Sequence, residues 1–282
     1  MFIQASASVF LSFVLALGLG GWSAGSASAL DSGWAETEGG RMRIVIDPEP
    51  SADGRLRGAL DIDLDAGWKT YWKDPGGSGI PPLVDLGTST GLVLDEIGFP
   101  PPVRIDDGYS VWAGYTQSVR LPLLLRRTSA GAATLDANVF IGICDKVCVP
   151  FQAHFRLPVP EGASSDAGAI ALVAEAWNAL PSAPTVDFRV SDVQRAPDWR
   201  RFSIAVTLPG FRPKGAEAEL FVAGPAGWAF GPPETMPAAN GSAVFEARIE
   251  RHPKDADLTA PLPLDVTVTY GARSFATRLD LR

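Results

Sequence analysis

Residues 135–157, LDANVFIGICDKVCVPFQAHFRL, decide the fold because they contain two alternating runs separated by a short polar segment. In the first run every odd position from 135 to 143 is apolar, and in the second every odd position from 149 to 157 is apolar. An alternation with period two predicts a β-strand that is buried on one face. Two such strands joined by Asp145-Lys146-Val147 predict an antiparallel hairpin with a short loop.

The chain has two cysteines, Cys144 and Cys148, which end these two strands at the loop. Both occupy even positions, so both are expected on the outward face of the hairpin. Along one extended strand they would lie about 13 Å apart, at roughly 3.3 Å per residue, which is too far for a disulfide. Directly opposed hairpin residues have Cβ atoms about 4.5–5.5 Å apart. The pattern therefore predicts a pair that can form and break a disulfide without moving the core.

The role of this pair has two main interpretations. A structural disulfide would close a ring of about five residues and restrain the unfolded chain by only about 2 kcal/mol, which is little for a domain with a large core. A redox-active pair instead requires accessible sulfurs, one to attack and one to resolve the mixed disulfide. Asp145 and Lys146 lie between the cysteines and act on a thiolate in opposite senses. The ring size favours the redox interpretation and leaves the structural one open.

A metal site is a third interpretation, because two cysteines and His154 are ligands that suit Cu(I) or Zn(II). However, His154 lies six residues beyond Cys148, which is roughly 20 Å along an extended strand. No nearby methionine or second histidine completes a ligand set. We therefore expect no metal and no other cofactor.

Similar alternation runs through most of the 282 residues and predicts an all-β protein of two antiparallel β-sandwich domains, at 30–160 and 185–282. In LDIDLD, residues 60–65, we expect one apolar and one acidic face. In WKTYWK, residues 68–73, Trp68, Thr70 and Trp72 alternate with the other three residues. In the second half the alternating sets are Phe202, Ile204, Val206 and Leu208; Leu264, Val266, Val268 and Tyr270; and Phe275, Thr277, Leu279 and Leu281.

A helical linker is predicted between the two domains, at 161–184. Residues 166–180 are rich in alanine, and one of Ser164, Ser165 or Asp166 is expected to cap the helix, which Pro181 and Pro184 end. The expected apolar stripe consists of Ile170, Val173, Trp177 and Leu180.

The N-terminal segment, residues 1–29, has the pattern of a signal peptide. An apolar run at 9–19 is followed by Ala27-Ser28-Ala29, an A-x-A cleavage pattern. The run is shorter than the roughly 20 residues that span a bilayer. No Lys or Arg precedes it, so an uncleaved anchor is the alternative; either way we expect an exported, periplasmic protein. The net charge of −8 without a basic cluster argues against nucleic-acid binding.

Several motifs resemble the N-terminal periplasmic domain of the DsbD/ScsB thiol:disulfide interchange family. They are GWKTYWKDPG at 67–76, GIPP at 79–82, FPPP at 99–102 followed by Gly108-Tyr109, and CDKVCVP at 144–150. The resemblance covers roughly residues 40–158, and the second sandwich is similar to the longer, ScsB-like members. It implies an immunoglobulin-like fold and a Cys144/Cys148 dithiol that passes electrons to periplasmic substrate proteins, with Cys148 favoured as the attacking thiol.

The resemblance also implies a cap loop over the cysteines, which maps to residues 105–112. Tyr109 or Trp112 is expected to supply the covering ring, although an ordinary turn packed on the sheet explains these aromatics equally well. Asp106, Asp107 and Asp145 are candidate acid–base helpers, with plain surface turn residues as the alternative.

Two departures from the family pattern bear on function. DsbD itself separates its cysteines by five residues, whereas three separate them here, as in ScsB-like members. Full-length members continue into a membrane-embedded electron carrier and a thioredoxin-like domain, which these 282 residues do not include. We therefore expect thioredoxin-like periplasmic proteins and a separate membrane electron carrier as partners. The alternative function is a non-catalytic binding or copper-handling module with a structural disulfide.

Overall fold

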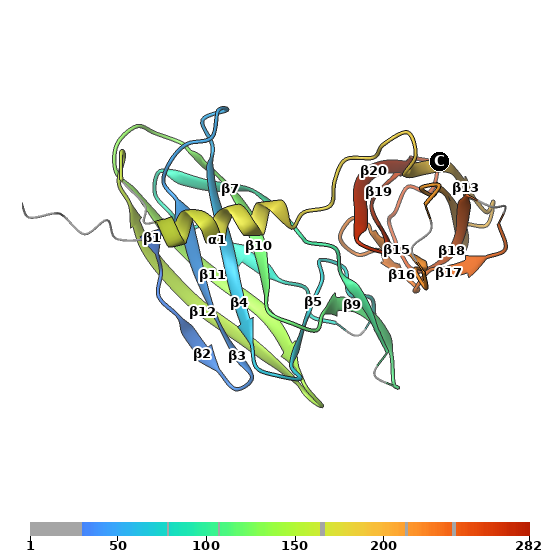
Figure 1. The fold of residues 1–282 in the computed structure, drawn as a ribbon, viewed down its shortest axis with the longest axis horizontal. Coiled ribbons are helices and arrows are strands. Elements are labelled where there is room, and N and C mark those ends of the chain that lie inside the picture. The colour runs from blue at the N-terminus through green and yellow to red at the C-terminus, as the bar shows by residue number, and fades with distance from the viewer. Residues whose placement is uncertain (1–29, 78, 107, 164–166, 212–213, 239–240) are drawn as a thin grey trace, which may run out of the picture.

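The computed structural model describes residues 30–282 except 78, 107, 164–166, 212–213 and 239–240. The predicted signal peptide, the three candidate helix caps and Asp107 therefore lie outside the described residues. The described chain folds mainly into antiparallel strands, which confirms the predicted all-β class (Figure 1). No helix in this part of the chain is long and apolar enough to cross a membrane.

The first sandwich has two sheets that pack face to face around an apolar core. One sheet has the order β1-β3-β4-β10-β7, with β2 added to β3, and the other has the order β12-β11-β5-β9-β8, with β6 added to β11. The strand bounds are β1 Leu30–Asp31, β2 Ala35–Thr37, β3 Gly40–Asp47, β4 Leu56–Leu64, β5 Lys69–Tyr71, β6 Leu83–Asp85, β7 Leu92–Ile97, β8 Val103–Asp106, β9 Val111–Tyr115, β10 Val119–Arg127, β11 Ala133–Cys144 and β12 Cys148–Val159.

The second sandwich repeats this design with a smaller pair of sheets (Figure 1). One sheet has the order β13-β14-β18-β16, with β17 added to β18, and the other has the order β15-β19-β20. Phe202, Leu264 and Phe275 are buried in its core, as the alternation predicts. The strand bounds are β13 Arg189–Arg195, β14 Arg201–Thr207, β15 Ala218–Ala223, β16 Ala229–Phe230, β17 Glu234–Met236, β18 Ser242–Arg251, β19 Leu262–Tyr270 and β20 Arg273–Leu281.

The predicted helix forms as α1, Ala167–Asn178, but it is packed on the first sandwich instead of lying free between the two. Its buried residues are Ala169, Val173 and Ala176, which contact Val45 of β3 and Ala59 of β4. The expected stripe was therefore partly wrong, because Ile170 is 39% exposed. Small side chains on both partners allow the helix axis to approach the sheet closely, which selects the alanine face over the bulkier one.

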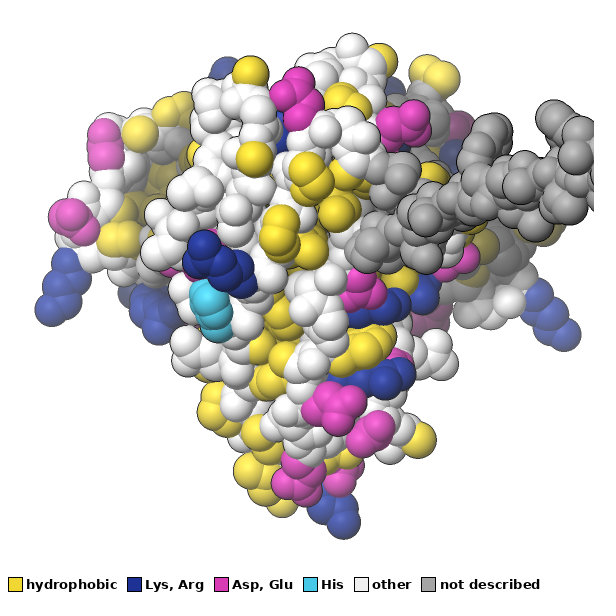
Figure 2. All heavy atoms as spheres, turned by 90° about the vertical axis from the view of Figure 1, so that its left-hand side faces the viewer, with side chains coloured by type: hydrophobic (Ala, Val, Ile, Leu, Met, Phe, Trp, Pro, Cys, Tyr) yellow, Lys and Arg dark blue, Asp and Glu magenta, His cyan; other side chains and the backbone are white. Residues whose placement is uncertain are grey.

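The acidic face predicted for residues 60–65 also needs correction, since Asp61 is buried. Its carboxylate lies 3.0 Å from Arg43 and 3.2 Å from Arg120, which come from the strands on either side. A buried charge requires such partners. On the face drawn in Figure 2, basic and acidic side chains likewise lie beside one another.

Candidate functional site: a capped disulfide at a hairpin end

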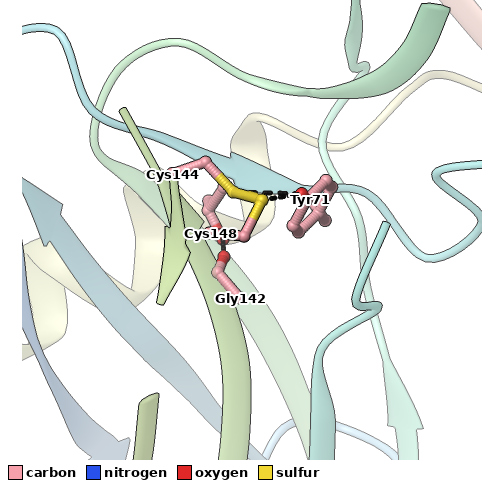
Figure 3. The surroundings of a disulfide bond; sticks show 5 residues. Tyr71, Gly142, Cys144 and Cys148 are labelled. Atoms are coloured by element: carbon pink, nitrogen blue, oxygen red, sulfur yellow. Dashed lines mark hydrogen bonds between the residues drawn. A yellow bond between two sulfur atoms is a disulfide. The ribbon is translucent and has the colours of Figure 1, made fainter. Parts of the chain in front are cut away.

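The two cysteines meet at the end of the longest hairpin of the first sandwich. Strands β11 and β12 pair without interruption from Ala133↔Val159 to Cys144↔Cys148. The cysteines form a disulfide with Cα atoms 4.2 Å apart, and residues 145–147 make the exposed loop (Figure 3). The predicted hairpin, its loop and the opposed pair are therefore confirmed.

The two sulfur-bearing residues differ in exposure, which the alternation did not predict. Cys144 is only 4% exposed, whereas Cys148 is exposed. Cys144 does lie on the outer face of the sheet, but that face is covered by a small apolar cluster containing Tyr71, Ile105 and Trp112, with Ile80 at its edge. Long-range contacts therefore bury one sulfur that the strand pattern places toward solvent.

Tyr71 is a residue of the site that sequence reasoning did not single out. Its hydroxyl oxygen lies 3.0 Å from Cys144 Sγ and 2.8 Å from Cys148 Sγ (Figure 3). A disulfide sulfur carries no proton, so the hydroxyl is the donor in this state. The signal was present in the alternation, because Thr70 and Trp72 point to the core and leave Tyr71 on the outer face with the cysteines.

The backbone beside the disulfide is shaped to receive this tyrosine. A Cβ on Gly142 would lie 2.8 Å from Tyr71 Cε2 and 2.9 Å from Ile80 Cβ, which is closer than real Cβ atoms approach. On the other side of the strand, Thr70 Oγ1 donates to the Gly142 carbonyl over 2.8 Å. The absence of a side chain at Gly142 therefore leaves space for the Tyr71 ring on the sheet, and the Thr70 hydrogen bond joins β5 to β11.

The segment expected as a cap, residues 105–112, lies in the hairpin β8–β9, whose described residues 103–106 and 108–115 we call the cap hairpin. Ile105 and Trp112 are directly opposed in it, and the Trp112 ring centroid lies 4.6 Å from that of Tyr71. Trp112 is 5% exposed, whereas Tyr109, at the hairpin turn, is 100% exposed. Of the two rings considered from the sequence, the structure therefore places Trp112 over the disulfide and Tyr109 in solvent.

Two of the candidate acid–base residues, Asp106 at the end of β8 and Asp145 in the loop between the cysteines, are exposed. The Asp106 carboxylate accepts the Gly108 N–H over 2.9 Å, which stabilises the turn of the cap hairpin. Asp145 is exposed in the loop between the cysteines. The geometry of these two residues thus agrees with the surface-turn interpretation.

His154 is held far along the hairpin from the cysteines. It is opposed to Asn138, and its Nε2 lies 2.8 Å from Asp136 Oδ1. A hydrogen bond from Thr88, followed by the one to His154, holds the pKa of Asp136 below its usual range. Within the described residues, no group of three His, Cys, Asp or Glu side chains is arranged to hold a metal ion.

Comparison with known proteins matches this site to a family. The family model described as "Thiol:disulfide interchange protein DsbD, N-terminal" matches residues 44–160. This segment belongs to the DsbD N-terminal family. The match contains both cysteines, Tyr71 and the cap hairpin of this DsbD-type domain.

A solved structure extends the likeness of fold beyond the DsbD-type domain. The crystal structure of the N-terminal periplasmic domain of ScsB from Proteus mirabilis is 19% identical and superposes with a TM-score of 0.69. The alignment covers 90% of this chain and 99% of that one, so it includes strands of both sandwiches. The comparison with curated proteins found no match.

A Tyr71→Phe substitution tests the hydroxyl of the DsbD-type domain. We expect reduction of the disulfide by a thiol to slow by about tenfold, because the departing thiolate loses a hydrogen-bond donor while the covering ring remains. The measurement is the rate of reduction under excess dithiothreitol.

Tyr115→Phe is the matched control for this substitution. Tyr115 is also a buried tyrosine of the DsbD-type domain, and its hydroxyl donates to the Pro100 carbonyl over 2.9 Å. Equal slowing in both variants would mean that the effect is not specific to the Tyr71 hydroxyl.

Proposed function

We propose that this chain is a periplasmic thiol:disulfide interchange protein that passes electrons through Cys144 and Cys148. The observation that carries the proposal is the asymmetry of the pair: one sulfur-bearing residue is exposed, its partner is buried, and one hydroxyl lies within 3.0 Å of both sulfurs. A structural disulfide does not require an accessible sulfur atom, whereas thiol–disulfide exchange begins when a thiolate attacks an accessible sulfur.

The exchange follows from which sulfur a thiolate can reach. The partner's thiolate attacks Cys148 Sγ, the Cys144–Cys148 bond breaks, and Cys144 leaves as a thiolate beside the Tyr71 hydroxyl. A second thiol of the partner then attacks the mixed disulfide and releases Cys148. In balance, two electrons and two protons pass from a partner dithiol to the pair, and the partner becomes a disulfide. The reverse sequence oxidises the pair.

Thioredoxin-like proteins are the partners that suit this sequence of steps. They carry two neighbouring cysteines, of which one attacks and the other resolves. Val147, beside Cys148 in the loop, is 73% exposed and offers an apolar contact next to the reachable sulfur. We propose a membrane-linked carrier as the other partner, which exchanges electrons with the same pair.

The domain organisation that we propose assigns the chemistry to residues 30–160. Residues 161–184 connect this redox domain to a second sandwich domain at 185–282, which contains no cysteine. Residues 1–29 serve as the export signal in this proposal, which accounts for an oxidising compartment in which the disulfide persists.

The reduction potential of the pair tests the proposal. We expect a value between those of thioredoxin and of oxidising catalysts, roughly −270 to −120 mV. The measurement is the fraction of reduced Cys144/Cys148 at equilibrium with glutathione buffers, followed by electron transfer from a reduced thioredoxin-like protein. A potential well below about −300 mV would instead assign the pair to a structural bridge.

A further inference from the structure

At the end of β5 and within β8, consecutive residues face the disulfide and the second sandwich in turn. Tyr71 of β5 and Ile105 of β8 contact Cys144 in the apolar cluster on one side. Their neighbours Trp72 and Arg104 contact the second sandwich on the other side. Successive side chains of a strand point to opposite faces. Contacts that hold Trp72 and Arg104 in position therefore also restrict the positions of Tyr71 and Ile105 beside the disulfide.

Arg104 makes the most specific of these contacts, with strand β15. Its Nη2 donates to the Leu220 carbonyl over 2.8 Å, and its Nε lies 3.6 Å from Glu219 Oε1. The guanidinium also lies over the Phe221 ring, 5.0 Å from the ring centroid. One side chain at the base of the cap hairpin thus contacts three consecutive residues of the second sandwich.

Phe221 of the second sandwich makes a further contact with the first sandwich. It belongs to β15, yet it is packed into the apolar core of the first sandwich and is 2% exposed. Its ring meets Trp72 edge to face with centroids 6.0 Å apart. Beside it, Lys73 Nζ lies 3.0 Å from Asp265. The strand that carries Tyr71 is therefore anchored to the second sandwich as well.

The outer half of the cap hairpin has different surroundings. A pocket of about 430 Å³ lies between it and the second sandwich and is lined by Tyr109, Val111 and Trp112 on one side and by Phe230 and Pro232 on the other, with the contact pair Arg104 and Phe221 also in its lining. The base of the cap hairpin is therefore held by direct contacts, whereas its tip borders open space.

We propose that Arg104 and Phe221 are positioning residues through which the second sandwich holds the base of the cap hairpin against the disulfide. The second sandwich thereby sets how readily Cys144 is uncovered, and opening is confined to the outer half of the hairpin, which has room to move into the pocket. The inference rests on the proposed function only for the reason why Cys144 would need to be uncovered.

The test compares Arg104→Met with a matched control, Arg273→Met, in the full chain. Both arginines lie over a phenylalanine ring and pair with a carboxylate, but Arg273 contacts Phe188 and Asp187 within the second sandwich. For Arg104→Met we expect the Cys144–Cys148 disulfide to be reduced by excess dithiothreitol roughly two- to tenfold faster, as loss of a hydrogen bond permits. For Arg273→Met we expect the original rate.

Hydrogen exchange gives a second measurement that general destabilisation would not reproduce. In Arg104→Met the amides of 103–106 and 111–115 are expected to exchange faster, while those of β19–β20 keep their protection. If Arg104→Met does not fold, Glu219→Gln and Phe221→Leu are measured in the same way, and the same result is expected of them.

Two outcomes would overturn the proposal: an unchanged reduction rate in the variants of the contact, or an equal acceleration in Arg273→Met. Reduction by a small thiol does not require a protein partner. A faster rate with dithiothreitol together with no transfer to any thioredoxin-like protein would therefore leave this inference standing and reject the proposed function.

Discussion

A Cys148→Ser variant is expected to lose disulfide exchange completely, whereas Cys144→Ser is expected to keep a thiol that attacks a partner. The reason is the unequal exposure of the pair, because Cys144 is covered by Tyr71 and Trp112 while Cys148 is exposed. Each variant also loses the five-residue ring, so both should be destabilised similarly, by about 2 kcal/mol. Their difference in reactivity therefore reports on accessibility and not on stability.

The measurement uses a thioredoxin-like protein with a single cysteine that carries an aromatic thiol as a mixed disulfide. Attack by the chain's remaining thiolate releases the coloured aromatic thiol and leaves the two proteins joined, because no resolving thiol is present. We expect rapid release and a stable covalent complex with Cys144→Ser, and release at the background rate with Cys148→Ser. Faster reaction of Cys148→Ser would assign the attack to Cys144 and reject the order of steps proposed above.

A Trp112→Ala substitution is expected to have the largest effect on the cap. Trp112 is 5% exposed and packs on Tyr71, so its removal should cost about 3 kcal/mol of the free energy of unfolding, within the range for a buried tryptophan. It also uncovers Cys144, so we expect the disulfide to be reduced by dithiothreitol on the order of tenfold faster or more.

Trp177→Ala separates the two effects of this substitution. Trp177 lies on α1, where its indole N–H donates to the Gly58 carbonyl over 3.2 Å and its ring packs under Arg57. Its removal should lower the thermal unfolding temperature without changing the reduction rate. A reduction rate in Trp112→Ala no faster than in Trp177→Ala would show that Trp112 does not shield the disulfide.

The local parts of the site could be predicted from the sequence because they depend on neighbouring residues. Alternation in residues 135–157 determines which faces the side chains take, and the three-residue loop then brings Cys144 opposite Cys148. The resemblance pointed to residues 105–112 as the cap, and two of them, Ile105 and Trp112, lie in the apolar cluster with Cys144.

The remaining features depend on partners far away along the chain, which no local pattern specifies. Cys144 is buried by residues 32 to 73 positions earlier in sequence, Trp112 and Tyr71. Asp61 is buried because Arg43 and Arg120 come from two other strands. The apolar stripe of α1 was only partly correct, since Val173 is buried but Ile170 is exposed, because the shape of the sheet below it, and not hydrophobicity alone, selected the buried side.

The docking of α1 on the first sandwich has a consequence for the contact at Arg104. Because the helix is fixed to the sheet as far as Asn178 and Ser182 already exchanges backbone hydrogen bonds with Ser274 and Ala276 of the second sandwich, only residues 179–181 lie between the two attachment points. So short a tether keeps the second sandwich at an effective local concentration of about millimolar or more. An interface too weak to join separate molecules can therefore persist within one chain, so that a few contacts are enough to hold the base of the cap hairpin.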